Sequence, residues 1–180
     1  MKKAVIAVGG NSLIKDKDHQ SVPDQYKAIC ETVRHVVGMI ENGYNVIMTH
    51  GNGPQVGFIL RRSEIARGEL HEVPLDSCGA DTQGAIGYQI QQAFHNEFKK
   101  RGIKKNVVTV VTQVLVDKND DAFKKPTKPI GSFMAKEEAD KKVKEEGWNI
   151  KEDAGRGYRR VVASPMPKDI VEIDAIKKLI

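Results

Sequence analysis

Two short glycine-rich stretches follow apolar runs and have residue types suited to binding a small anion. Gly9-Gly10-Asn11 follows the run Lys3–Val8, and Gly51-Asn52-Gly53 follows the run Tyr44–Thr49. Glycine has no Cβ, so its backbone reaches positive φ and approaches a ligand closely. Free N–H groups at the start of a helix attract negative charge. If the two runs are neighbouring strands, both turns lie at one edge of a sheet and face one crevice.

The two turns do not match the common phosphate motifs. The P-loop ends in Gly-Lys-Ser/Thr, a tripeptide that this sequence lacks. The spacing of Gly51, Gly53 and Gly57 does not fit Gly-x-Gly-x-x-Gly, and His50 stands where a dinucleotide fold needs a ribose-binding acid. Glycine turns between strands and helices also occur without any ligand, so that alternative stays open.

The spacing of apolar residues predicts the helices and strands that position these turns. Apolar residues recur at three and four between Tyr26 and Ile40, which predicts a helix that starts near Pro23 and ends at Gly43. Its place between two apolar strands makes a βαβ unit with parallel strands. Helices are expected over 55–67 and 78–100, with irregular chain over 69–77. A third strand is expected over 107–116, so an open, mostly parallel sheet covered by helices is predicted.

The composition changes at Asp117, and residues 117–160 are interpreted as an excursion from the sheet. Lys128 lies in Pro126-Thr-Lys-Pro129, where proline restrains the neighbouring backbone. Arg156 lies between two glycines, and its guanidinium suits phosphate or carboxylate oxygens. A rigid surface loop is the alternative. A charged helix over about 135–146 and a strand over 158–163, with Arg159 and Arg160 on opposite faces, follow from the pattern.

Composition restricts the class of protein. The chain has 180 residues, a net charge of +5, 6% aromatic residues and two cysteines. The lysines alternate with acids and few aromatics are available to stack on bases, so nucleic-acid binding is not favoured. Cys30 and Cys78 are expected to be buried thiols rather than a disulfide or metal site. With no apolar run long enough for a membrane helix or a signal peptide, a cytoplasmic protein is expected.

Seven motifs in order along the chain make the sequence resemble the carbamate kinases, a branch of the amino acid kinase superfamily. His-Gly-Asn-Gly-Pro-Gln and Pro-Thr-Lys-Pro are the most specific of them. The motifs are Gly9-Gly-Asn11, Thr49-His-Gly-Asn-Gly-Pro-Gln-Val-Gly57, Cys78-Gly-Ala80, Gln83-Gly-Ala-Ile-Gly-Tyr88, Val111-Thr-Gln-Val-Leu-Val-Asp117, Pro126-Thr-Lys-Pro-Ile-Gly131 and Glu152-Asp-Ala-Gly-Arg-Gly157.

The resemblance implies a three-layer α/β/α sandwich around an open, mostly parallel sheet. It implies reversible phosphoryl transfer from ATP to carbamate, giving ADP and carbamoyl phosphate, used to make ATP in arginine fermentation through the deiminase pathway. It also implies a homodimer. Residues 1–116 and 161–180 would form a substrate-binding lobe, and 117–160 a protruding lid subdomain. The nucleotide-binding lobe, which binds most of ATP or ADP with Mg²⁺, would be absent from this chain.

By the same resemblance, the two glycine turns hold the transferred phosphoryl group and the carbamate. Gly10, Asn11 and Lys128 would be catalytic, Arg156 would help to position the lid, and no metal ligand is expected. Losing Lys128 would cost about 2 kcal/mol or more of transition-state stabilisation. Asp81-Thr82 stands where Met-Ser is expected and is interpreted as surface or interface variation. Without the second lobe, the isolated chain is expected to be inactive and to expose apolar surface.

Three alternatives remain at this point. A different acid kinase of the same superfamily would use another acceptor, although Pro-Thr-Lys-Pro and the excursion over 117–160 argue against it. A non-catalytic lobe that only holds an anion is the second alternative. A dinucleotide oxidoreductase is the third, and the residue at position 50 argues against it.

Overall fold

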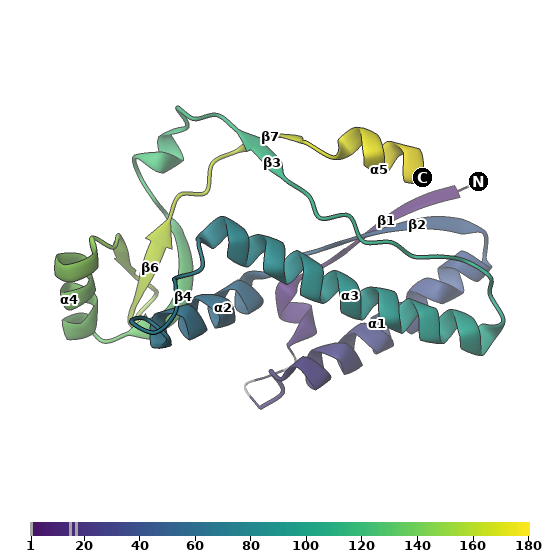
Figure 1. Ribbon diagram of the computed structural model, residues 1–180, viewed down its shortest axis with the longest axis horizontal. Helices are drawn as coiled ribbons and strands as arrows, with labels where there is room; N and C mark the ends of the chain where they lie inside the picture. Colours follow the sequence, from purple (N-terminus) through teal and green to yellow (C-terminus); the bar gives the residue numbers. More distant parts are fainter. Residues whose placement is uncertain (1, 15, 17) are drawn as a thin grey trace. The chain divides into compact units, whose positions relative to one another are not determined.

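The computed structural model describes residues 2–14, 16 and 18–180, and the chain divides into two compact units. The first contains Met1–Gln55, Asp76–Val111 and Asp174–Ile180. The second contains Val56–Leu75 and Thr112–Ile173. Figure 1 labels most of the helices and strands of both units, which are described separately below.

A parallel strand pair organises the first unit. Lys2 pairs with Tyr44 and Val8 with His50, so the two strands end together at the two glycine turns. The predicted βαβ unit is therefore confirmed. The unit's elements are β1 (Lys2–Val8), the 3-10 helix η1 (Gly10–Leu13), α1 (Val22–Glu41), β2 (Tyr44–His50), the first turn of α2 (Gly53–Ile65), α3 (Leu75–Arg101) and α5 (Ile173–Leu179).

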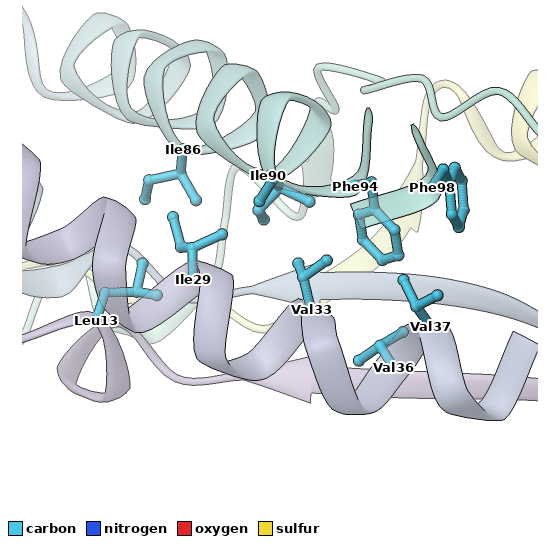
Figure 2. Close-up of a cluster of buried hydrophobic side chains, with 10 residues drawn as sticks. Leu13, Ile29, Val33, Val36, Val37, Ile86, Ile90, Phe94 and Phe98 are labelled. Carbon is cyan, nitrogen blue, oxygen red and sulfur yellow. The ribbon is translucent and has the colours of Figure 1, made fainter. Parts of the chain in front are cut away.

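Helices α1 and α3 pack against one face of this strand pair and form the hydrophobic core. Figure 2 shows Ile86, Ile90 and Phe94 of α3 pointing toward Ile29 and Val33 of α1. Ile6, Val8, Val46 and Met48 of the strands pack against the same cluster. Val5, which alternates with them on β1, is 67% exposed. One face of the strand pair is thus buried, and the alternation along β1 follows the strand period of two.

The start of α1 is fixed by a capping box. The Ser21 side chain accepts a hydrogen bond from the Asp24 backbone N–H, and the Asp24 carboxylate accepts one from the Ser21 N–H. Each bond satisfies an N–H group that the helix itself leaves without a partner. Pro23 lies in the first turn, as predicted, and Gly43 has a φ of 84° just after the helix. The chain therefore enters and leaves α1 at defined points.

The second unit is built from short antiparallel strands and one exposed helix. Its three-stranded sheet has the order β4-β6-β5, and a separate pair joins β3 to β7. The predicted charged helix and the strand that starts at Tyr158 are confirmed. The elements are most of α2, β3 (Val114–Val116), the 3-10 helix η2 (Asp121–Phe123), β4 (Lys128–Met134), α4 (Lys136–Glu146), β5 (Ile150–Glu152), β6 (Tyr158–Val162) and β7 (Pro167–Ile170).

The sheets are smaller and less parallel than the sequence predicts. Among the described strands only β1 and β2 pair in parallel, and the predicted strand over 107–116 is limited to Val114–Val116. A strand needs a neighbouring backbone as well as β-branched residues, and Val108 and Val111 are 59% and 47% exposed without one. The other pairs are antiparallel: β5 and β6 are joined by the short segment 153–157, whereas β4 pairs with β6 and β3 with β7 across longer connections.

Some elements differ from the prediction. Helix α3 begins at Leu75, inside the stretch expected to be irregular, and β4, β5, β7 and α5 were not predicted. Among the described residues, no helix is long and apolar enough to cross a membrane.

Cys78 is buried, as expected, whereas Cys30 is half-buried, and neither forms a disulfide. Burial raises the pKa of the Cys78 thiol.

Candidate anion-binding site

The two glycine turns are in direct backbone contact in the first unit. The Gly51 N–H donates a 2.8 Å hydrogen bond to the carbonyl of Val8, which joins the end of β2 to the end of β1. The Ser12 N–H donates a 2.9 Å bond to the carbonyl of Gly9 and closes the first turn of η1. The two bends therefore meet, which is the arrangement that an anion site made from both turns requires.

The contact between the turns leaves no room for a side chain at Gly10 or Gly51. A Cβ on Gly10 would lie 3.0 Å from the backbone nitrogens of Asn52 and Gly53. A Cβ on Gly51 would lie 2.9 Å from the nitrogen of Gly10. Main-chain amides of both turns thus lie close together, and successive N–H groups that face one concavity are a known kind of anion site. Glycine is needed here for close approach of backbones.

Asn52 is held in place by a residue that the sequence analysis interpreted wrongly. Its side-chain amide donates a 2.8 Å hydrogen bond to the hydroxyl of Thr82, which in turn donates to the carbonyl of Gly79, also at 2.8 Å. Thr82 is only 2% exposed, so it is not surface variation, whereas Asp81 is exposed. The hydroxyl fixes the Asn52 side chain from the first turns of α3, and the serine expected at position 82 would supply the same hydroxyl.

Two buried glutamines, Gln55 and Gln25, support the turn at Gly10 through hydrogen bonds. Gln55 is 7% exposed, and its side-chain nitrogen lies 3.5 Å from the carbonyl of Gly10 and 3.3 Å from Oε1 of Gln25. Gln25 is 5% exposed and donates to the carbonyl of Gln20. Neither residue was predicted from the sequence. The available signal was that Gln25 falls on the buried face of α1, four residues before Ile29.

Lys128 and Arg156 belong to the second unit. Lys128 is the exposed first residue of β4, where it pairs with Val162 of β6. Arg156 lies in a tight turn beside Ala154, Gly155 and Gly157, all of which have positive φ. The structure therefore brings together Gly9, Gly10 and the 51–53 turn, and it describes the lysine and the arginine in the other unit. The Asn11 side chain lies outside the described part.

Arg156 is paired inside its own subdomain. Its guanidinium donates a 3.0 Å hydrogen bond to Asp153, lies 5.0 Å from the Phe133 ring centroid and is largely exposed. Arg159 makes the same two kinds of contact, and Arg160 stacks on Trp148 instead, so the two arginines do face different sides of β6. The hydrogen bonds from Arg156 and Arg159 lower the pKa of Asp153.

The described residues contain no group of three or more His, Cys, Asp or Glu side chains that could hold a metal ion. At the two turns of the first unit the structure places main-chain N–H groups and the Asn52 amide close together. These groups neutralise and orient oxygen atoms and form no covalent bond with them.

The chain's relatives share this segment of structure. The amino acid kinase family profile matches residues 2–155. The chain belongs to the amino acid kinase family. It is 52% identical to a carbamate kinase of Clostridium perfringens over 99% of its length, and 55% identical to a carbamate kinase-like protein of Escherichia coli over 98%. It spans 58% and 56% of the length of these two relatives.

A solved structure gives the same result for the fold. The carbamate kinase of Giardia lamblia bound to AMP-PNP matches 99% of the chain with a TM-score of 0.87 and 44% sequence identity, and 57% of that protein is covered. The chain thus has the α/β fold of carbamate kinase structures over the N-terminal portion of their length. The predicted family membership is confirmed.

Proposed function

We propose that this chain is the carbamate- and carbamoyl-phosphate-binding portion of a carbamate kinase. The whole protein would transfer a phosphoryl group reversibly between ATP and carbamate, with ATP synthesis in arginine fermentation as its use. The observation that carries the proposal is the contact between the Gly10 and Gly51–Gly53 turns, which brings the main-chain nitrogens of Asn52 and Gly53 close to Gly10. The family membership and the kinase names of the relatives support it.

Phosphoryl transfer asks the protein mainly to position two reactants and to neutralise charge on the equatorial oxygens. We assign the first task to the amides of the 9–11 and 51–53 turns and to the Asn52 side chain, which Thr82 orients. We assign to Lys128 the positive charge that meets the phosphoryl oxygens, and to Arg156 the positioning of the lid subdomain over 117–160. The three-layer sandwich and the homodimer are part of the same proposal.

ATP and ADP are assigned mainly to the part of the relatives that lies beyond this segment. The described residues do not offer a carboxylate cluster for Mg²⁺, so the metal is expected to arrive with the nucleotide. The Giardia lamblia relative binds AMP-PNP, which supports a nucleotide site in the family. The isolated chain is therefore expected to bind carbamoyl phosphate and to form little or no ATP from it.

A calorimetric titration of this chain with carbamoyl phosphate tests the proposal, together with amide chemical shifts of isotope-labelled protein. Saturable heat and shifts at Gly10, Asn52 and Gly53 are expected. Lys128→Ala should weaken binding about tenfold, because one charge-assisted interaction is worth roughly 1.5–3 kcal/mol. Lys124→Ala, which removes an exposed lysine of the same unit paired with Asp121, is the matched control. A folded chain that shows neither heat nor shifts contradicts the proposal.

A second candidate is an acid kinase with another acceptor. It is favoured by the 55% identity to a protein named only as carbamate kinase-like. Glutamate and aspartate, titrated alongside carbamoyl phosphate, distinguish the two: a preference for either amino acid would replace carbamate as the acceptor.

A further inference from the structure

The three-stranded sheet that carries Lys128 has few apolar contacts with the rest of its unit. Of the hydrophobic residues in the second unit that the structure describes, only Ala139 and Val161 are buried. Two cavities, of about 300 and 150 Å³, lie between the segment 56–75 and the residues of this sheet and its flanking helix α4. Leu60, Ile130 and Trp148 line both cavities. Space rather than packed side chains therefore separates much of α2 from the sheet.

One bidentate ion pair bridges the two sides. Arg67, just beyond the end of α2, places its two terminal nitrogens 2.6 and 3.1 Å from the two carboxylate oxygens of Glu146, the last residue of α4. The Glu146 side chain is 17% exposed and the Arg67 side chain 39%. Fork-to-carboxylate pairing fixes orientation as well as distance, so this contact holds α4 in a defined pose.

Arg67 lies in a segment that several hydrogen bonds hold in place. The carbonyl of Ala66 accepts hydrogen bonds from the N–H groups of Glu69 and Leu70, both at 3.0 Å, and Gly68 turns the chain with a φ of 97°. The Ser63 hydroxyl accepts a 2.8 Å bond from the Val73 N–H and ties the loop back to α2. The Nε of Arg67 also donates to Glu72 at 2.5 Å. The guanidinium is therefore aimed before it meets α4.

Glu146 lies at a position of its helix that is electrostatically unfavourable for a carboxylate. A carboxylate at the C-terminus of a helix meets the negative end of the helix dipole. Glu146 occupies this position on α4, beside the left-handed C-cap Gly147. Its pKa is lowered to about 2, first by the hydrogen bond from Arg67 and then by the one from Lys142. A residue that breaks a local rule and is compensated by a distant partner marks a site with a specific task.

Contacts lead from α4 to Lys128. Trp148 follows α4, and its ring contacts two cations: Lys142 of α4, 5.0 Å from the ring centroid, and Arg160 of β6, at 4.6 Å. Arg160 pairs with Ile130 of β4, and Val162 of β6 pairs with Lys128. The position of the lysine is thus linked to the position of α4 through one indole ring and one strand.

We propose that Arg67 is a positioning residue, whose ion pair with Glu146 holds the sheet that carries Lys128 against the C-terminal half of α2. This inference rests on the proposed function for what Lys128 binds. Without the pair, the two cavities leave the subdomain free to move, and the lysine charge is spread over many positions instead of one.

The test uses Arg67→Met and Glu146→Gln in this chain, with carbamoyl phosphate affinity and amide hydrogen exchange as readouts. Each variant should weaken the affinity about fivefold to tenfold and raise exchange of α4 and β4 about tenfold or more. Exchange of α1 and α3 should not change. The double variant Arg67→Met with Glu146→Gln should be no weaker than either single variant, because all three lack the same ion pair, whereas independent losses of stability would add.

Glu145→Gln is the matched control. Glu145 is the neighbour of Glu146 on α4 and pairs at 4.0 Å with exposed Lys141. Wild-type behaviour is expected for this variant. Unchanged β4 exchange in Arg67→Met and Glu146→Gln overturns the inference. If the wild-type chain binds no carbamoyl phosphate, the proposed function fails, while β4 exchange still decides the role of Arg67.

Discussion

The two units of the chain are held together in different ways. Apart from Ala139 and Val161, every buried hydrophobic residue that the structure describes belongs to the first unit, and so do the buried polar residues Gln25, Gln55, Thr82 and Gln89. The second unit relies on ion pairs such as Arg67–Glu146 and on cations stacked over Trp148 and Phe133.

This difference matches what each unit contributes to the proposed site. An anion site made of main-chain amides depends on backbone positions that do not shift, and a packed core of strands and helices provides them. Exposed ion pairs without bidentate geometry contribute little net stability, and a region with few buried apolar contacts opens more easily. The lysine is therefore carried by the part of the chain that adjusts most readily. Four experiments follow, from the largest expected effect to the smallest.

Gly10→Ala should have the largest effect. Its Cβ would lie 3.0 Å from the nitrogens of Asn52 and Gly53, in the region where the anion is expected. Two hydrogen bonds to a charged group, at roughly 1.5 kcal/mol or more each, would be lost, so carbamoyl phosphate affinity should fall about 100-fold. Calorimetry measures the affinity, and thermal unfolding shows whether the fold survives.

Gly57→Ala is the control for this substitution. Gly57 lies inside α2 and a Cβ there meets nothing within 4 Å. Alanine suits a helix interior better than glycine does. Binding should be unchanged and stability slightly higher. Full affinity in a folded Gly10→Ala protein would show that the anion does not sit between the two turns.

Gly87→Ala should destabilise the first unit. A Cβ at this position of α3 would lie 2.3 Å from the methyl carbon of Thr109 and 2.7 Å from its hydroxyl oxygen. Overpacking of this kind costs about 1–3 kcal/mol, which denaturant unfolding detects. Gly84→Ala, on the same helix and open to space, should instead gain about 0.5–1 kcal/mol. Equal stability of the two variants would contradict close packing at Gly87.

These glycines also show which structural features can be predicted from the sequence and which cannot. Spacing alone predicted α1, β2 and the parallel pair, because a helix with one buried face and a buried strand leave strong periodic patterns. The same patterns placed Gly10 and the 51–53 turn at one sheet edge. Pattern reasoning does not tell a glycine that packs, such as Gly87, from an open one such as Gly84, because the difference depends on Thr109, which is distant in sequence.

The parts of the site that escaped prediction are those fixed by tertiary partners. Thr82 was taken for surface because nothing near it in the sequence reports that Asn52 faces it. The strand expected over 107–116 was overextended because β-branched composition does not report whether a neighbouring backbone is present. The Arg67–Glu146 pair joins residues 79 positions apart, and no local pattern connects them.

Acid should loosen the second unit before the first. The pKa of Glu146 is lowered to about 2 by Arg67 and Lys142, and that of Asp153 is lowered by Arg156 and Arg159. A carboxylate with a lowered pKa in the folded state stabilises the protein fully above its unfolded value, roughly 4.5 for Glu. That contribution is lost as the pH falls from there toward about 2 for Glu146.

Amide hydrogen exchange of α4 between pH 5 and pH 2.5, corrected for intrinsic rates, measures this loss. Protection of α4 should decline over that interval while α1 stays protected, and Glu146→Gln should remove most of the pH dependence. If α1 and α4 lost protection in parallel, the two units would open together. The difference in packing between them would then have no effect on their stability in acid.

The smallest effect concerns the starts of two helices with the same backbone geometry. Ser21 before α1 has φ −67° and ψ 160° and caps the helix, whereas Ala135 before α4 has φ −67° and ψ 161° and has no side-chain cap. Glu138 already lies three residues after Ala135, so Ala135→Ser would complete the Ser-x-x-Glu pattern of a capping box.

Such a cap is worth about 1 kcal/mol, so Ala135→Ser should slow α4 exchange about fivefold, and Ser21→Ala should lower the stability of the first unit by a similar free energy. The two substitutions act on matched backbones in opposite directions. If only Ser21→Ala has an effect, the start of α4 is not limiting, and its pose depends on the Arg67–Glu146 pair at its other end.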